Sequence, residues 1–164
     1  MRTPTESLTV PRDGSVAAVK AAVHLLCGKV CSGKSHYAKS LATELGAITL
    51  SMDELMLSLF DERLGANHDL VAARSKAYLF RLAARLSALG LPVVLDFGLW
   101  TRADRQEARD YFARLSIPTK LYYLYADEAV RKARVLQRNQ RVRQGLDQSY
   151  TIDEDMDLAF SARF

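Results

Sequence analysis

Residues 28–35, which read Gly-Lys-Val-Cys-Ser-Gly-Lys-Ser, have the types and the spacing needed to hold a chain of phosphates. They match G-x-x-x-x-G-K-[ST], the phosphate-binding loop or Walker A motif, at every fixed position. Glycines at both ends allow successive backbone N–H groups to point toward an anion. Lys34 would place a mobile positive charge on the phosphates, and the Ser35 hydroxyl is a hard oxygen ligand for Mg²⁺. The predicted nucleotide-binding residues are Gly28, Lys29, Val30, Cys31, Ser32, Gly33, Lys34, Ser35 and His36.

The sequence around this loop supplies the two elements that the motif needs. The apolar run at residues 21–27 is typical of a buried parallel strand. After the loop, apolar residues recur at helical spacing as far as Leu45, and Gly46 marks a helix end. A helix beginning at Gly33 would also direct the positive end of its dipole at a bound phosphate.

Asp96 ends a second apolar strand, residues 92–96, about sixty residues after Ser35. A Walker B carboxylate occupies this kind of position and helps to hold Mg²⁺ beside the loop hydroxyl. The alternative is a strand-terminal aspartate that binds only loop amides. We favour the metal ligand.

Asp53 follows the strand predicted at residues 47–51, and it is our candidate for a general base. A carboxylate near the γ-phosphate could accept the proton of an attacking hydroxyl group. The competing interpretation is structural, because Ser51 and Glu54 have the spacing of a helix capping box and Asp53 would then only complement the helix dipole.

Two groups of arginines are candidates for binding anions. Arg102 and Arg105 follow the Asp96 strand, where they could clamp a substrate, or they are ordinary surface residues. Arg131, Arg134, Arg138 and Arg141 fall on one face of a predicted helix, with no acidic i+4 partners among them. This stripe predicts a lid over the phosphates; the alternatives are a solvated helix face and a nucleic-acid surface.

The alternation of strands and helices predicts an α/β fold with a parallel sheet covered by helices on both faces, a three-layer arrangement. A long helix at residues 67–89 should bury one side, formed by Leu70, Val71, Tyr78, Leu82, Leu86 and Leu89. The remaining predicted elements are a weak helix at 54–64, a helix at 102–116, a strand at 119–125, a basic helix from Asp127 to about Arg143 and a last helix near 153–162. No fifth strand is evident.

The 164 residues are 49% hydrophobic and carry a formal net charge of +4, which suits a single globular domain that binds phosphates. We expect a flexible arm over residues 1–20 and one domain over 21–164. The two cysteines, Cys27 and Cys31, fit reduced thiols rather than a zinc site. No secretion signal or membrane span is recognisable, so we expect a cytoplasmic protein that does not bind membranes.

With these motifs placed, residues 23–160 resemble the small P-loop kinases that include chloramphenicol phosphotransferase, polynucleotide 5′-kinase, gluconate kinase and the zeta toxins. The resemblance rests on residues 28–35, Ser51-x-Asp53, residues 93–96 and the arginines between 131 and 141. It implies a P-loop NTPase fold with a basic helical lid, and transfer of the γ-phosphoryl group of ATP, with Mg²⁺, to a hydroxyl group. It also implies that Asp53 is the base, that Lys34 and Arg134 stabilise the transition state, and that Arg138 stacks on adenine.

Several alternatives remain at this stage. Members acting on nucleic acid or sugar nucleotides often carry Asp-x-x-Arg after the second strand, whereas this chain has Met56 at the arginine position. A small-molecule acceptor is therefore favoured over a polynucleotide. The guanine-reading Asn-Lys-x-Asp motif of GTPases is missing, and Phe97 replaces the glutamate that motor ATPases place after the Walker B aspartate. A non-catalytic regulator that binds ATP is the alternative from another functional class.

Overall fold

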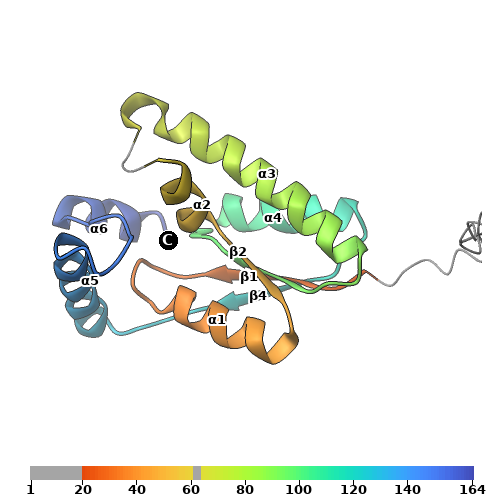
Figure 1. Ribbon diagram of the computed structural model, residues 1–164, viewed down its shortest axis with the longest axis horizontal. Helices are drawn as coiled ribbons and strands as arrows, with labels where there is room; N and C mark the ends of the chain where they lie inside the picture. Colours follow the sequence, from red (N-terminus) through yellow and green to blue (C-terminus); the bar gives the residue numbers. More distant parts are fainter. Residues whose placement is uncertain (1–19, 61–63) are drawn as a thin grey trace, which may run out of the picture.

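A four-stranded parallel sheet forms the centre of the computed structural model, which describes residues 20–60 and 64–164 (Figure 1). The strands are β1 (Val23–Cys27), β2 (Ile48–Ser51), β3 (Val93–Asp96) and β4 (Thr119–Tyr123), and their order is β2-β3-β1-β4. All neighbouring pairs are parallel, with Val23 paired to both Val93 and Thr119. The predicted arm lies outside the described residues, apart from Lys20.

Helices cover both faces of the sheet, which confirms the predicted three layers (Figure 1). Helices α3 (His68–Ala88) and α4 (Arg102–Arg114) pack on one face, and α1 (Lys34–Leu45) packs on the other. Helix α2 (Met52–Leu59) follows β2 directly, and a short 3₁₀ turn, η1 (Gly65–Asn67), precedes α3. Helices α5 (Glu128–Arg143) and α6 (Glu154–Ala162) lie together beyond the ends of the strands.

The two central strands are apolar because both of their faces are buried. Every residue of β1 is buried, as are the first three residues of β3. On the α3–α4 side they contact a core that includes Phe80, Ala83 and Phe112. On the α1 side Leu26 and Val94 contact Ala38 and Leu41. This core holds the carboxyl ends of the strands, and therefore the loops that follow them, in fixed positions.

Helix α3 buries a different side from the one that the sequence predicted. Its buried residues are Ser75, Leu79, Phe80, Ala83 and Ser87, whereas Leu70, Tyr78 and Leu89 are exposed. Small residues allow the helix to approach the sheet closely, and the Ser87 hydroxyl donates a hydrogen bond to the Ala21 carbonyl. On the predicted side Val71, Leu82 and Leu86 are half-buried, and Leu86 packs against the edge of this core. No helix in the described ranges is both long enough and apolar enough to cross a membrane.

Candidate active site

The Walker A residues form a tight loop between β1 and the first turn of α1. Three residues of this loop have positive φ angles, namely Gly28 (153°), Cys31 (57°) and Gly33 (104°). Gly33 is the residue before α1, and no side chain caps the N–H groups at this helix start. These amides, together with the helix dipole, give the loop the character of an anion-binding site.

Gly28 is required by a close backbone approach as well as by its φ angle. A Cβ atom at this position would lie 2.4 Å from the carbonyl oxygen of Leu124 and 2.7 Å from the Ser32 Oγ. Leu124 follows β4, and its N–H donates to the Cys27 carbonyl at 2.8 Å. The loop is thus closed against the β4–α5 connection, with no space for a side chain between them.

Lys34 folds back over the loop and donates hydrogen bonds to the carbonyls of Gly28 and Lys29, both at 2.8 Å. Burial lowers the pKa of its ammonium group, while the carboxylates of Asp96 and Asp53 act in the opposite direction. Both predicted carboxylates therefore lie within electrostatic reach of the loop lysine. The structure brings together the three charged residues on which the sequence prediction depended.

Asp96 ends β3 next to the start of α1. Burial raises the pKa of its carboxyl group, whereas a side-chain hydrogen bond with Ser35 and the charge of Lys34 oppose that rise. The Ser35 hydroxyl thus lies beside the Asp96 carboxylate, as a magnesium site between a Walker A serine and a Walker B aspartate requires. Both are oxygen donors, which suits Mg²⁺.

Asp53 lies in the first turn of α2, exposed to solvent. The Ser51 hydroxyl caps this helix by accepting from the Glu54 N–H at 3.3 Å, and Asp53 takes no part in that hydrogen bond. Only the serine half of the expected capping box is present, unlike the complete box that Thr101 and Asp104 form at α4. The Asp53 carboxylate is thus not used by the helix cap, and its charge acts on both Lys34 and Asp96.

Arg131 departs from the prediction of a continuous arginine stripe. Its side chain is 1% exposed and forms ion pairs with Glu128 in the preceding turn and with Asp157 of α6. These hydrogen bonds, the one to Asp157 first, raise the pKa of the guanidinium group. The prediction that Arg131 belongs to a stripe of arginines available to an anionic ligand is therefore wrong, because Glu128 of the same helix and Asp157, distant in sequence, already neutralise it. Arg141, at the other end, contacts Asp147 and the Leu146 carbonyl.

Arg134 and Arg138, in contrast, face the phosphate-binding loop. Arg134 donates to the Cys31 carbonyl at 3.4 Å, and its Nη1 lies 3.8 Å from where a Cβ on Gly33 would stand. Arg138 is close enough to Lys34 to lower the pKa of that lysine, and within the described residues its buried Nε has no hydrogen-bond partner. The Ser32 hydroxyl is unpaired in the same sense. Unpaired donors beside a glycine loop fit a polyanionic ligand such as a triphosphate.

Helix α5 and the loop also make an apolar contact, which was not expected from the sequence. Val30 of the loop packs with Val135 of α5 and Ile152, and Cys31, Trp100 and Phe160 border this cluster. The Asn139 side chain exchanges two hydrogen bonds with the Ile152 backbone, at 2.6 and 2.9 Å. The only advance sign was the polar segment after α5, whose packing could not be read from its composition. Helix α6 thus holds α5 beside the nucleotide loop.

The remaining predicted residues, Arg102 and Arg105, are not brought together with Asp53. Asp53 follows β2 at one edge of the sheet, whereas both arginines line a groove over β4 at the opposite edge. Arg105 is also engaged internally, since it donates to the carbonyls of Leu99 and Trp100 at 2.9 and 2.8 Å. His36 is exposed in the first turn of α1.

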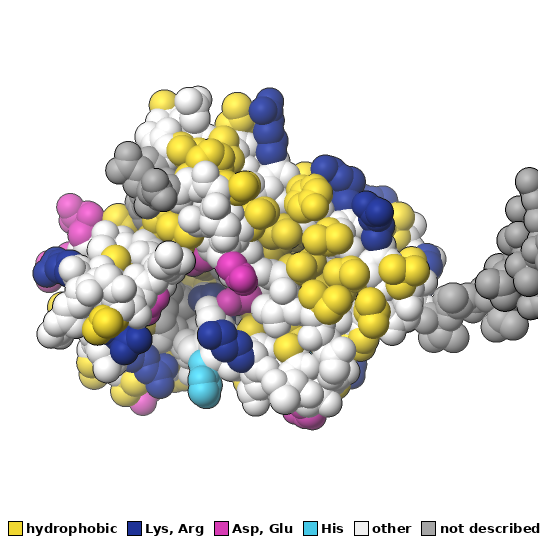
Figure 2. Space-filling view, viewed as in Figure 1, with side chains coloured by type: hydrophobic (Ala, Val, Ile, Leu, Met, Phe, Trp, Pro, Cys, Tyr) yellow, Lys and Arg dark blue, Asp and Glu magenta, His cyan; other side chains and the backbone are white. Residues whose placement is uncertain are grey.

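A second groove, with a volume of about 400 Å³, lies between α2 and α3, on the Asp53 side of the sheet. Its lining residues are Leu55, Leu59, Val71, Arg74, Ser75 and Tyr78. Figure 2 shows the surface hollowed between the α5–α6 part and the rest of the molecule, with acidic and basic side chains gathered around the hollow. Charged groups thus meet beyond the strand ends, and an apolar surface begins at Leu55, two residues after the candidate base.

Comparison with solved structures finds the same fold in several proteins. One is a protein from Chloroflexus aurantiacus for which kinase activity is proposed. It is 19% identical to this chain, with a TM-score of 0.69, and the alignment covers 89% of this chain and 78% of the other chain. Kti12 from Chaetomium thermophilum, solved with ADP-AlF3, is 16% identical over 87% of this chain and 79% of its own, with a TM-score of 0.68. A chain of the Pnkp1/Rnl/Hen1 RNA repair complex is 15% identical over 91% of this chain, with a TM-score of 0.69. This chain spans 45% of that larger protein.

Among curated proteins, none matches this sequence. A family model described as an AAA domain matches residues 23–154, a segment that runs from β1 to the start of α6. That segment contains the phosphate-binding loop, both carboxylates and the two arginines that face the loop. Because the match covers most of the 164 residues, the chain belongs to this AAA domain family, and its fold is that of the P-loop kinases.

Proposed function

We propose that this protein is a kinase that transfers the γ-phosphoryl group of ATP, with Mg²⁺, to a hydroxyl group of a small or nucleotide-like molecule. The observation that carries the proposal is the convergence of Lys34, Asp53 and Asp96 at one glycine loop. Motor ATPases, which hydrolyse ATP, place their second carboxylate directly after the Walker B aspartate, where this chain has Phe97; here the second carboxylate, Asp53, follows another strand. The free thiols Cys27 and Cys31 fit a cytoplasmic location.

The chain's own residues divide this task among them. The amides of residues 28–35 and the Lys34 ammonium hold the β- and γ-phosphates. Ser35 and Asp96 hold Mg²⁺, which when bound offsets the phosphate charge and orients the transferred group. Arg134 stabilises charge on that group, and Arg138 lies against the nucleotide from α5.

Asp53 orients the acceptor and takes its proton as the new bond to phosphorus forms. It is exposed and free of the helix cap, so an incoming hydroxyl group can reach it. The groove between α2 and α3 begins two residues later, at Leu55, and we propose that it holds the apolar part of the acceptor. A mixed aliphatic and aromatic lining with one arginine fits a small molecule carrying an apolar body and a polar or anionic group.

The proposal is tested by incubating the protein with γ-labelled ATP, Mg²⁺ and a metabolite extract, and by identifying the labelled product. The Lys34→Ala and Asp53→Asn variants are run in parallel. Transfer that depends on both residues supports the proposal. Tight ATP binding without transfer to any acceptor would instead identify an ATP-binding regulatory protein.

The likeness to a chain of an RNA repair complex favours one alternative, a polynucleotide 5′-hydroxyl kinase. Under that alternative the labelled product is the 5′ end of an oligonucleotide. Binding of single strands would also weaken steeply as salt increases, because phosphate contacts release counterions. Met56, where an arginine would be expected, weighs against it.

A further inference from the structure

The loop between β3 and α4, residues 97–101, follows directly after the candidate metal ligand Asp96. Phe97 and Leu99 are both buried in the core that the sheet forms with α3 and α4. Leu99 has a φ angle of 40°, in the left-handed region that a bulky side chain adopts only at a cost. Strain of this kind persists where the surrounding structure holds it, so contacts from the rest of the fold must hold this loop.

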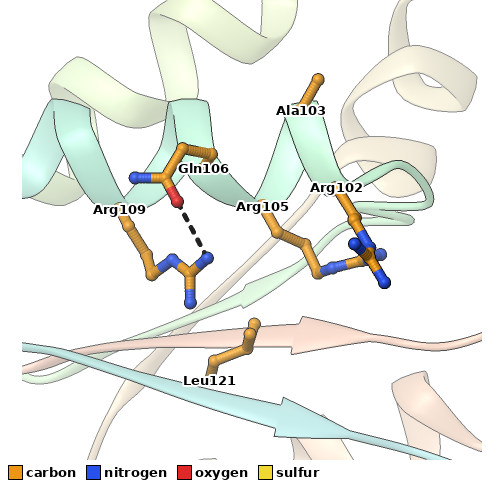
Figure 3. A pocket seen from close by; sticks show the side chains of 6 residues that line it. All are labelled: Arg102, Ala103, Arg105, Gln106, Arg109 and Leu121. Carbon is orange, nitrogen blue, oxygen red and sulfur yellow. Dashed lines mark hydrogen bonds between the residues drawn. The ribbon is translucent and has the colours of Figure 1, made fainter.

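Arg105, one turn into α4, supplies contacts of this kind. Its Nη1 donates to the carbonyls of Leu99 and Trp100, at 2.9 and 2.8 Å. Because both carbonyls bond to one nitrogen, the orientations of two consecutive peptide units are fixed together. Figure 3 shows the Arg105 side chain running toward the start of α4, whereas Arg109, one turn further along, bonds to Gln106. The two arginines therefore share a helix face but have different partners.

Trp100, whose carbonyl Arg105 holds, reaches the lid and the phosphate-binding loop. Its ring centroid lies 4.4 Å from that of Phe160 in α6. It also packs against the apolar cluster in which Val30 of the phosphate-binding loop contacts Val135 of α5. Trp100 thus links the loop after β3 to the nucleotide loop and to the lid helix.

The indole ring of Trp100 rests on the backbone of Gly98. A Cβ atom at position 98 would lie 2.5 Å from both Nε1 and Cε2 of the ring, so a larger residue would displace it. Within the described residues the buried indole N–H has no hydrogen-bond partner, which is also unfavourable. Two local costs, at Leu99 and at the indole, thus accompany the observed position of Trp100, and the hydrogen bonds from Arg105 help to offset them.

We propose that Arg105 is a positioning residue, which holds the loop after Asp96 in the form that seats Trp100 against the phosphate-binding loop and the lid. The proposal rests on the function proposed above, since the lid that Trp100 contacts carries Arg134 and Arg138. The positive charge of the guanidinium group strengthens both of its hydrogen bonds. Arg105 therefore contributes to nucleotide binding through Trp100, without touching the nucleotide or the acceptor.

Trp100 is the only tryptophan of the 164 residues, so intrinsic fluorescence reports on its surroundings alone. In the full-length protein, Arg105→Met keeps the length of the side chain and removes both hydrogen bonds. We expect its emission to move to longer wavelength, and Arg105→Lys, which retains a charged donor, to recover the wild-type emission. Arg109→Met makes the same change one turn along α4 and should leave the emission unchanged. An unchanged emission in Arg105→Met, an equal shift in Arg109→Met, or a shift that Lys does not reverse would overturn the proposal.

The link to the lid is tested by the affinity for a non-hydrolysable ATP analogue with Mg²⁺. Arg105→Met should lower this affinity by about fivefold. Because the loss acts through the lid, the double variant R105M/R138A should bind at most about twofold more weakly than Arg138→Ala alone. Additive losses would show that Arg105 stabilises the fold without positioning the lid, and would overturn the proposal.

Gly98→Ala displaces the indole and leaves Arg105 unchanged, so it decides the question even if Arg105→Met does not fold. We expect it to shift the emission and to lower the affinity for the analogue as well. A shifted emission with unaltered affinity would overturn the link between Trp100 and the lid. None of these measurements requires phosphoryl transfer, so a protein that binds ATP without transferring phosphate would refute the proposed function and leave the role of Arg105 standing.

Discussion

Arg131 of α5 and Asp157 of α6 form a buried, two-pronged ion pair, in which both terminal nitrogens of the guanidinium group donate to the carboxylate. The second of these hydrogen bonds is 2.7 Å long. The Arg131 side chain is 1% exposed, and that of Asp157 is 12% exposed. This pair fixes the helix that carries Arg134 and Arg138 toward the phosphate-binding loop.

We predict that Asp157→Asn destabilises the protein and weakens ATP binding together. Removing the carboxylate leaves a buried guanidinium group without full compensation, at a cost of about 3 kcal/mol. For a domain of this size this corresponds to a decrease of roughly 6–12 °C in the melting temperature. Thermal denaturation and ATP titration measure the two effects, and Glu128→Gln, at an exposed partner of the same arginine, should alter both far less. Unchanged ATP affinity in the folded Asp157→Asn variant would show that the pair stabilises the fold without positioning the lid.

Asp53→Asn should lower turnover at least a hundredfold while ATP affinity stays nearly intact. The amide keeps the size of the side chain but cannot accept the acceptor's proton. Steady-state kinetics and ATP titration separate the two effects, and Glu54→Gln in the same helix turn is the matched control. A parallel loss of affinity and turnover would assign Asp53 to nucleotide binding instead.

The two arginines that face the loop should matter for ATP binding, whereas Arg141 should not. Arg138→Ala removes a half-buried guanidinium group whose charge acts on Lys34, so we expect about a tenfold loss of ATP affinity from one charge-assisted contact. Arg141→Ala removes the same charge from a site whose partners are Asp147 and Leu146. ATP titration at low salt and at tenfold higher salt compares the variants, and the wild type should lose the most affinity. Equal effects of the two substitutions would show that this side of α5 is a solvated helix face that takes no part in ATP binding.

Asp96→Asn should stabilise the protein without ligand and abolish activity. A carboxyl group whose pKa is raised in the folded chain gives stability that is present below its unfolded pKa, about 3.9, and is lost as pH rises through the folded value. At pH 7 the charged Asp96 therefore costs stability, and the neutral amide avoids that cost. We expect the melting temperature to rise by about 2–4 °C at pH 7, or roughly 1 kcal/mol, with the gain shrinking as pH falls through the raised pKa of the folded chain and absent below about pH 4. A gain that is the same at both pH values would point to a cause other than ionisation.

Cys31 offers a direct measure of loop occupancy. It lies partly exposed in the phosphate-binding loop, whereas Cys27 is buried and burial raises the pKa of its thiol. An alkylating reagent should therefore modify Cys31 first, and ATP should slow that reaction. Mass spectrometry of digested protein follows each thiol, and Cys31→Ser should remove the fast phase. Modification at the same rate with and without ATP would argue against nucleotide binding at this loop.

The loop, the strand ends and the order of elements could be predicted because each depends on local sequence. The Walker A spacing predicts a phosphate-binding loop, and the apolar runs of β1 and β3 predict buried strands. Gly46 marks the end of α1. These predictions depend little on the rest of the chain. The predicted boundaries accordingly match the described helices and strands closely. The weak helix after β2, predicted at 54–64, departs from those bounds at both ends. It begins at Met52, because Ser51 caps it, and it ends at Leu59, because the backbone of Phe60 is extended.

The features that sequence reasoning missed depend on partners distant in the chain. Nothing near Arg131 indicates that Asp157, 26 residues later, will neutralise it. Likewise, the buried side of α3 includes Ser75 and Ser87, small residues that allow close packing but give no hydrophobic signal in the sequence. The spacing of residues along a helix shows which side chains share a face, but the packing of the whole fold determines which partners that face contacts.

The contact between Val30 and Val135 joins the phosphate-binding loop to α5, the lid helix. A shift of the loop backbone when a triphosphate binds would also displace the apolar contact with α5. Nucleotide binding and the position of the lid helix are therefore coupled. A lid transplanted from a relative would consequently need its matching residue at position 30, even if every arginine were kept.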